Sequence, residues 1–205
     1  KQNPATNTDM YNVAVGDEAG APITTSAYNT LVGGLAGDAI TTSAGYNTAF
    51  GYLALSADTL GQESCAIGSQ ALATQNFTST TLTYNTAVGT SAGRILTTGV
   101  YNTFVGGLAG DGTDDGNENV AIGHQALSGN CGDNNTVVGV GAAIATSGGE
   151  NTIVGKNAGY AMTSAFNNLL LGTDAGRTGS PGGNVTTHDN LICLGDENIT
   201  ASHIQ

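Results

Sequence analysis

The amino-acid sequence predicts an all-β fold, a parallel β-solenoid of about ten coils with about 17 residues in each. A unit of the form Asn-x-x-(Val/Ile/Phe/Leu)-Gly-x-x-Ala recurs along nearly the whole chain. Large side chains are scarce among the 205 residues, with no Trp, 4 Phe and 2 Met, which suits a thin, elongated core. The 32 Gly residues, with Thr and Val between them, oppose helix formation.

The repeat is followed most easily from the glycine that ends each predicted strand, here named the anchor glycine. Ten anchor glycines stand 16 to 21 residues apart, and a weaker eleventh unit ends at Gly195. They are Gly16, Gly33, Gly51, Gly68, Gly89, Gly106, Gly123, Gly139, Gly155 and Gly172. A fixed period of this kind is typical of stacked repeat architectures. Coils that rise by about 4.8 Å each would form a rod about 50 Å long, with two strands expected in each coil.

The three residues before each anchor glycine predict the strand. The residues one and three positions before the glycine share one face of it, and the residue between them points to the other face. None of these positions is charged in any of the ten units, so the strand is expected to be dry on both faces. Because a coil this short has little interior, we expect the second face to be covered by self-association, most simply as a homotrimer around a long axis.

Two polar or small positions are nearly invariant. Asn stands four residues before the anchor glycine in nine of ten units, with Ser64 as the exception. Stacked in register, these residues are expected to form a ladder of amide hydrogen bonds. They are Asn12, Asn29, Asn47, Asn85, Asn102, Asn119, Asn135, Asn151 and Asn168. Ala stands three residues after the glycine in all ten units, which indicates tight packing there.

Tyr recurs five residues before the anchor glycine in the first part of the chain, at Tyr11, Tyr28, Tyr46, Tyr84 and Tyr101. An exposed row of Tyr rings can bind sugars, so these five residues are candidate glycan contacts. The alternative is that each ring packs over its neighbour at the edge of the coil. Later units carry Glu118, Asn134, Glu150 and Asn167 instead, so the surface changes from aromatic to polar along the rod.

The repeat divides the chain into three parts. Residues 1–10 are an N-terminal cap or linker, residues 11–176 hold the solenoid repeats, and residues 177–205 form a degenerate last coil and a C-terminal segment. Insertions collect at 73–83 and 177–188, where loops of a solenoid are expected.

Charge excludes several partners. The chain has 16 acidic and 4 basic residues, a net charge of −12, which repels nucleic-acid phosphates and anionic lipid. No stretch is long and apolar enough to predict a membrane span. We therefore expect the chain neither to bind nucleic acid nor to insert into a membrane.

The densest acidic cluster is Asp111, Asp114, Asp115 and Glu118, in a Gly-rich loop. Such a loop can supply oxygen ligands to calcium, the candidate cofactor, although the spacing does not match the standard calcium-binding loop. The alternative is a solvated acidic turn. Glycoside hydrolysis needs two carboxylates across a groove with one of them kept protonated, which adjacent solvated acids do not provide.

No other pattern indicates an active site. The residues His124, His188 and His203 are far apart, and Cys65, Cys131 and Cys193 show neither metal nor disulfide spacing. We therefore expect no catalytic residues and no enzymatic activity, and three small, buried cysteines.

The units Asn12–Gly16, Asn85–Gly89 and Asn119–Gly123 resemble the head repeats of trimeric autotransporter adhesins. The longer units from Tyr84 to Gly93 and from Tyr101 to Gly110 are more similar to repeats in bacteriophage tail fibres. The resemblance implies a left-handed parallel β-roll and a homotrimer.

In the phage group such repeats often precede an intramolecular chaperone that is cleaved after assembly. The segment Leu191–Thr200 resembles the stretch before that chaperone.

This resemblance and the composition together predict a non-enzymatic structural fibre protein, a segment of a phage tail fibre that acts in host attachment. Its partners would be itself and a host cell-surface glycan or protein, and its location extracellular, on a virion. The alternative is a bacterial surface adhesin, or a subunit that assembles end to end into an extracellular filament. Ice binding by Thr rows is a weaker third hypothesis, because the recurring Thr is expected on an inward-looking face.

Overall fold

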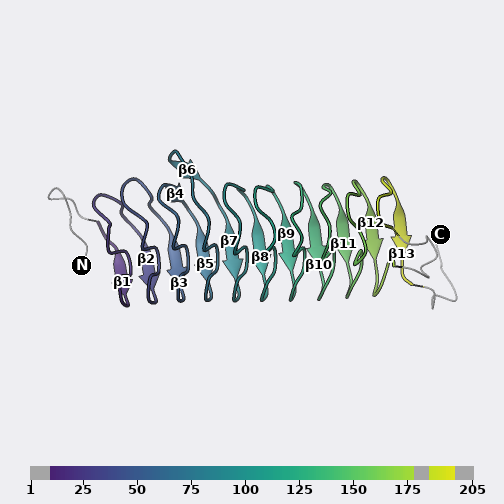
Figure 1. The fold of residues 1–205 in the computed structure, drawn as a ribbon, viewed down its shortest axis with the longest axis horizontal. Coiled ribbons are helices and arrows are strands. Elements are labelled where there is room, and N and C mark those ends of the chain that lie inside the picture. The colour runs from purple at the N-terminus through teal and green to yellow at the C-terminus, as the bar shows by residue number, and fades with distance from the viewer. Residues whose placement is uncertain (1–9, 178–184, 197–205) are drawn as a thin grey trace.

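The computed structural model describes residues 10–177 and 185–196, and one sheet runs through all of them (Figure 1). Each coil contributes a strand of three residues, and eleven such strands lie side by side in chain order. They are β1 (Val13–Val15), β2 (Thr30–Val32), β3 (Thr48–Phe50), β5 (Cys65–Ile67), β7 (Thr86–Val88), β8 (Thr103–Val105), β9 (Val120–Ile122), β10 (Thr136–Val138), β11 (Thr152–Val154), β12 (Leu169–Leu171) and β13 (Ile192–Leu194).

All neighbouring strands of this sheet are parallel, and equivalent repeat positions face each other. Thr86 pairs with Thr103, for example, and Val88 with Val105. The predicted parallel β-solenoid is confirmed, and the weak eleventh unit forms β13. The expectation of two strands in each coil is wrong, because most coils close through turns after a single strand. The described residues form no helix, so none of them belongs to a helix that could cross a membrane.

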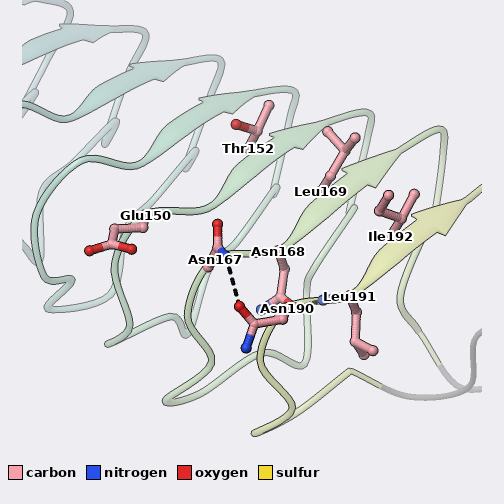
Figure 2. Close-up of a pocket in the computed structure, with 8 residues that line it drawn as sticks. All are labelled: Glu150, Thr152, Asn167, Asn168, Leu169, Asn190, Leu191 and Ile192. Carbon is pink, nitrogen blue, oxygen red and sulfur yellow. Dashed lines mark hydrogen bonds between the residues drawn. The ribbon is translucent and has the colours of Figure 1, made fainter.

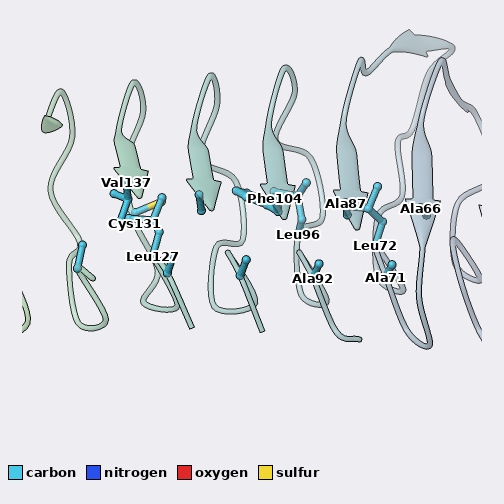
Figure 3. Close-up of a cluster of buried hydrophobic side chains, with 14 of the residues drawn as sticks. Ala66, Ala71, Leu72, Ala87, Ala92, Leu96, Phe104, Leu127, Cys131 and Val137 are labelled. Atoms are coloured by element: carbon cyan, nitrogen blue, oxygen red, sulfur yellow. The ribbon is translucent and has the colours of Figure 1, made fainter. Parts of the chain in front are cut away.

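The core runs along the inside of the coils as several parallel columns of side chains (Figure 3). Its main members are the middle residue of each strand and the Ala three positions after the anchor glycine, as at Phe104 and Ala109, both fully buried. Ala at the middle position is matched by Leu four positions after the glycine in three coils, as in the fully buried pairs Ala49 with Leu55 and Ala66 with Leu72. In the coils of Ala14 and Ala87 that position is glycine, and a large side chain of the next coil lies against it.

A large residue at the middle position is matched by glycine instead. The Gly110 Cα lies so close to the Phe104 ring that an added Cβ would come within 2.6 Å of it. The large side chain occupies the space that the glycine leaves, as close packing requires.

The anchor glycines are fixed by backbone geometry. Gly89 has a φ of +142°, and a Cβ added there would lie 2.5 Å from the carbonyl group of Gly106 in the next coil. Only glycine accepts both the conformation and the contact. The repeated glycine therefore sets the distance at which one coil stacks on the next.

One insertion interrupts the regular stack. Residues 73–83 extend the coil after β5, and a short strand β6 (Thr81–Leu82) pairs in parallel with β4 (Gly61–Gln62) to form a second, two-stranded sheet. This small sheet stands out from the rod in Figure 1. The insertion at 177–188 lies partly outside the described residues.

Candidate functional site

The strongest candidate for a functional surface is the face of the sheet that points out of the coils. We name it the outward face: the side chains one and three positions before each anchor glycine, together with those of β13. The prediction that both faces of the strand are dry requires a covering partner, and the single chain leaves the outward face open to solvent. Val154 is 39% exposed, Phe50 55% and Ile192 72%, whereas the middle residues of the same strands are buried.

The reason for this orientation lies in the neighbouring Asn. Side chains alternate along a strand, and the Asn four positions before the glycine is buried in most coils, as at Asn102 and Asn151. The residue two positions later therefore also points inward, and the residues on either side of it point outward. The sequence did not settle this choice, because both sets of positions are uncharged.

The outward face is uncharged along its whole length. Its members are Val13, Val15, Thr30, Val32, Thr48, Phe50, Cys65, Ile67, Thr86, Val88, Thr103, Val105, Val120, Ile122, Thr136, Val138, Thr152, Val154, Leu169, Leu171, Ile192 and Leu194. A strip about 10 Å wide over eleven strands has an area of about 500 Å². That is within the size range of the largest patch on a typical monomer, although 6 of the 22 side chains are Thr.

The Thr column also faces outward, which corrects the expectation that it looks inward. Thr30, Thr136 and Thr152 are exposed, and each stands beside a Val of the same strand. The orientation argument against ice binding is therefore wrong. These strands carry no Thr-x-Thr array, so the outward face still differs from the flat Thr rows that ice binding would need.

Inside the coils, the nine repeat asparagines form an amide ladder that Ser64 interrupts between Asn47 and Asn85. The Oδ1 of each Asn accepts the backbone N–H of the equivalent residue in the next coil, as from Asn102 to Asn85 at 2.9 Å and from Asn151 to Asn135 at 3.1 Å. The amide nitrogen donates mostly to a carbonyl of the next coil, as from Asn102 to Gly116 at 2.9 Å. Asn119 departs from this pattern, because its buried Nδ2 has no partner. The ladder holds the edge of the core where the strand begins.

The Tyr row lies beside the outward face, and its rings stack on one another. Tyr11 and Tyr28 have ring centroids 5.5 Å apart, and Tyr28 and Tyr46 4.9 Å apart, with planes within 12° of parallel. Tyr84 and Tyr101 form a second stack at 5.7 Å. Glu63 occupies the position between the two stacks. Stacking covers both faces of Tyr28 and one face of each other ring, so a glycan that meets this row would contact ring edges, hydroxyl ends and the outer faces of the end rings.

A shallow groove of about 380 Å³ lies near the C-terminal end of the rod, between the outward face and the column of side chains that continues the Tyr row (Figure 2). Glu150, Asn167 and Asn190 form one wall, and the Asn167 amide donates to the Asn190 Oδ1 at 2.7 Å. Thr152, Leu169 and Ile192 form the other wall, which is part of the outward face, and Asn168 and Leu191 complete the lining. The sequence did not predict this groove, because Asn190 and Ile192 belong to the degenerate last coil.

The four acidic residues at 111–118 are not gathered into a ligand set. Within the described residues, no three His, Cys, Asp or Glu side chains lie close enough to hold a metal ion. The side chains of Asp115 and Glu118 are exposed, and Asp114 accepts a hydrogen bond from Thr97 of the preceding coil. Partial burial raises the pKa of Asp111. The three cysteines are free thiols, Cys65 half-buried and Cys131 and Cys193 buried, whereas His203 lies outside the described residues.

Comparison of the chain with protein-family models, with curated proteins and with solved structures gives no match in any of the three. The outward face, the Tyr row and the groove are therefore the candidate functional features of the chain.

Proposed function

We propose that this chain is a non-enzymatic structural segment of an extracellular fibre, and that copies of it assemble side by side through the outward face. A homotrimer around the long axis is the simplest such assembly, because it brings three apolar faces to one centre. We further propose that the fibre is a phage tail fibre acting in host attachment, as the repeat resemblance implies.

The observation that carries this proposal is the absence of charge on the outward face. The chain as a whole has 16 acidic and 4 basic residues, yet all eleven three-residue strands of the main sheet lack a charged residue. Exposed apolar faces of this extent mark interaction sites. A partner with the same uncharged face and the same spacing of coils is supplied by another copy of the chain, whose columns repeat with the same period.

Assembly would also explain how a rod with few distinctive side chains can bind a host. Three parallel copies present each turn, Tyr row and groove three times, so weak contacts to a cell-surface glycan or protein add in avidity. The turns on the far side of the coils vary in length and sequence without disturbing the sheet, so they can differ in what they bind.

The oligomeric state tests the assembly proposal. Analytical ultracentrifugation of the purified chain should give a trimer at micromolar concentration. A double variant with Ile122→Lys and Val154→Lys places two cations on the outward face and should sediment as a monomer with unchanged circular dichroism. Both side chains already point to solvent in the single chain, being 40% and 39% exposed, so the variant keeps its coils.

A matched variant carries the same two charges elsewhere. Thr42→Lys and Thr98→Lys lie on exposed turns away from the sheet and should leave the trimer intact. A native chain that sediments as a monomer at every concentration, or a double Ile122→Lys and Val154→Lys variant that stays trimeric, rejects assembly through this face.

Electron microscopy separates the phage fibre from the alternative. Discrete rods of one length, and labelling of virion tails by an antibody to the chain, are expected. Filaments of indefinite length would instead favour a bacterial surface subunit that assembles end to end.

A further inference from the structure

Two columns of side chains border the outward face, one at each end of its strands. The leading column holds the residue five positions before each anchor glycine, from Tyr11 to Asn167, and so contains the Tyr row. The trailing column holds the residue directly after each anchor glycine, from Asp17 to Thr173. Because the strands are parallel and in register, both columns follow the rod from coil to coil.

Rotational symmetry about the long axis would bring the leading column of one copy against the trailing column of the next. All strands of the sheet run across the rod in the same direction. Copies related by rotation about an axis along the rod therefore place their strands head to tail around that axis, with equivalent coils at equal heights. Two copies packed face to face with their rods antiparallel would instead set the leading column on itself.

The two columns carry a carboxylate opposite a basic side chain at two heights, and like charges at none of the ten. The coil of β9 has Glu118 in the leading column and His124 in the trailing column, and the coil of β11 has Glu150 and Lys156. All four side chains are exposed. In a chain with 16 acidic and only 4 basic residues, a basic side chain opposite Glu150 is not expected from composition.

These charges are not paired within the single chain. Glu150 and Lys156 stand beyond the two ends of the same strand, about 15–20 Å apart. The one ion pair among the described residues joins Arg177 to Asp174. The pKa of Asp174 is lowered first by its hydrogen bond from Arg177 and least by the charge of Lys156, which thus lies near that carboxylate without pairing with it.

The groove in Figure 2 offers a seat for an ammonium group at Glu150. The Glu150 carboxylate and the Asn167 amide oxygen are acceptors on its polar wall, and an ammonium has three protons to donate. Thr152 and Leu169 on the other wall give apolar contact to the aliphatic stem of a lysine. Lys156 of a second copy would fill only the end of the groove at β11, so the end at β13 stays open to a ligand.

We propose that the two columns set the register between copies, and that the Glu150 carboxylate of one copy binds the Lys156 ammonium of the next. Glu118 and His124 pair in the same way two coils away. The pairing rests on the proposed assembly through the outward face, and it supplies what that face lacks. Val and Thr recur at every coil, so apolar contact alone does not fix the height of one copy against another. A shift by one coil would set Glu150 against Val140 or Thr173 and break both pairs, which is how charge specifies a partner's position.

Carbodiimide cross-linking of the purified native chain tests the pairing. The reagent joins a carboxylate to an amine in direct contact, with loss of one water molecule and no spacer. The chain has two lysines, Lys1 and Lys156, so few products can form. We expect covalent dimers and trimers on a denaturing gel, and peptide mapping should place the bond between Lys156 and Glu150. A bond from Lys156 to Asp174 of its own chain would leave the chain at monomer size.

Three variants assign the groups. Glu150→Gln removes the carboxylate and should lose the oligomers that are joined through Lys156. Lys156→Arg keeps the cation but has no reactive amine, so it should sediment as a trimer and give no such oligomers. Glu118→Gln is the matched control, because its partner His124 has no amine to couple, and it should cross-link as the native chain does.

Charge reversal gives an independent measurement. Glu150→Lys sets two ammonium groups against each other at three places in the trimer, and should raise its dissociation constant about tenfold or more. Adding Lys156→Glu restores opposite charges with their positions exchanged, and should recover most of that loss. A trimer that forms no covalent bond through Glu150, or a double variant no tighter than Glu150→Lys, overturns the pairing and leaves assembly through the outward face standing. A native chain that is a monomer at every concentration rejects both.

Discussion

The backbone N–H of Asn119 donates to the Asn102 side-chain Oδ1 in the preceding coil, at 3.0 Å. Asn102 in turn donates from its Nδ2 to the Gly116 carbonyl at 2.9 Å, and its own N–H donates to Asn85. The buried side-chain amide of Asn102 therefore satisfies two backbone groups of the following coil, the Asn119 N–H and the Gly116 carbonyl. Ser and Thr are too short to reach both groups, which explains why Asn is kept at this position along the rod.

Replacing Asn102 with Ala should destabilise the fold markedly. The change leaves the Asn119 N–H and the Gly116 carbonyl buried without a partner, and each unsatisfied group costs about 1–3 kcal/mol. We expect the free energy of unfolding in urea to fall by about 2–4 kcal/mol.

Asn130→Ala is the matched control, since the Asn130 side chain is exposed and accepts a single hydrogen bond, from the Asp114 N–H at 3.1 Å. It should change stability by no more than about 0.5 kcal/mol. Equal effects of the two substitutions would show that the amide ladder is not a main source of stability.

Gly89→Ala should prevent stable folding, or lower the free energy of unfolding by more than about 3 kcal/mol. The new Cβ would meet the Gly106 carbonyl group of the next coil at 2.5 Å, and the backbone has a φ of +142°. Gly107→Ala is a close control, because a Cβ there meets nothing nearer than the His124 ring at 3.7 Å. Soluble yield and thermal melting of the two variants decide the matter, and a Gly89→Ala chain as stable as the control would contradict the close-packing argument.

Most of the fold could be predicted from the repeat alone. At anchor glycines such as Gly89, every coil needs the same backbone conformation. Glycine therefore recurs in every unit and shows how the strands align from coil to coil. The inward or outward choice at Thr103 and Phe104 could not be predicted in the same way, since neither column carries charge. It depends on the buried Asn at the start of the strand, and the burial of an Asn is not visible in sequence.

The buried hydrogen bonds that join Gln75 to Asp58 and to Asn85 could not be predicted either. Gln75 stands seven residues after its anchor glycine, the buried position that Ile23 and Leu96 fill in other coils, and Asp58 stands at the same position one coil earlier. The sequence signals were these two polar residues and Ser64, the one rung of the ten without Asn. A unit that lacks Asn in an otherwise regular ladder is therefore a useful place to look for another side chain that makes the missing hydrogen bonds.

Thiol labelling should report assembly through the outward face. Cys65 is half-buried on that face, whereas Cys131 and Cys193 are inside the coils at 3% exposure. We expect a maleimide at pH 8 to leave the native assembly unmodified and to modify Cys65 alone in the Ile122→Lys and Val154→Lys variant.

The rates should depend on pH as the burial of each thiol requires. Burial raises the pKa of Cys65, and that of Cys131 to about 11. Labelling of Cys65 in the variant should therefore speed up as the pH rises from 8 to 9, because the thiolate is the reactive form, while Cys131 stays protonated. Peptide mapping distinguishes the sites, and rapid labelling of Cys65 in the native chain would argue that its outward face is uncovered.

The Tyr row should contribute to stability through ring stacking. Tyr28 is stacked on both sides, by Tyr11 and by Tyr46, and each aromatic pair is worth about 0.5–1.5 kcal/mol. Tyr28→Ala should therefore lower the free energy of unfolding by about 1–3 kcal/mol. Tyr52→Ala is the control, because Tyr52 is as exposed, at 54%, and the described residues show no ring stacked on it.

The same substitution tests glycan contact at the row. Stacking places the faces of Tyr28 against Tyr11 and Tyr46, and those faces are the part of a Tyr ring that binds a sugar. We therefore expect a chain with Tyr28→Ala and Tyr46→Ala to keep its attachment to host cells while it melts at a lower temperature. Loss of attachment at a temperature where the variant is fully folded would instead assign host contact to the Tyr row, through the ring edges and hydroxyl ends that the stack leaves exposed.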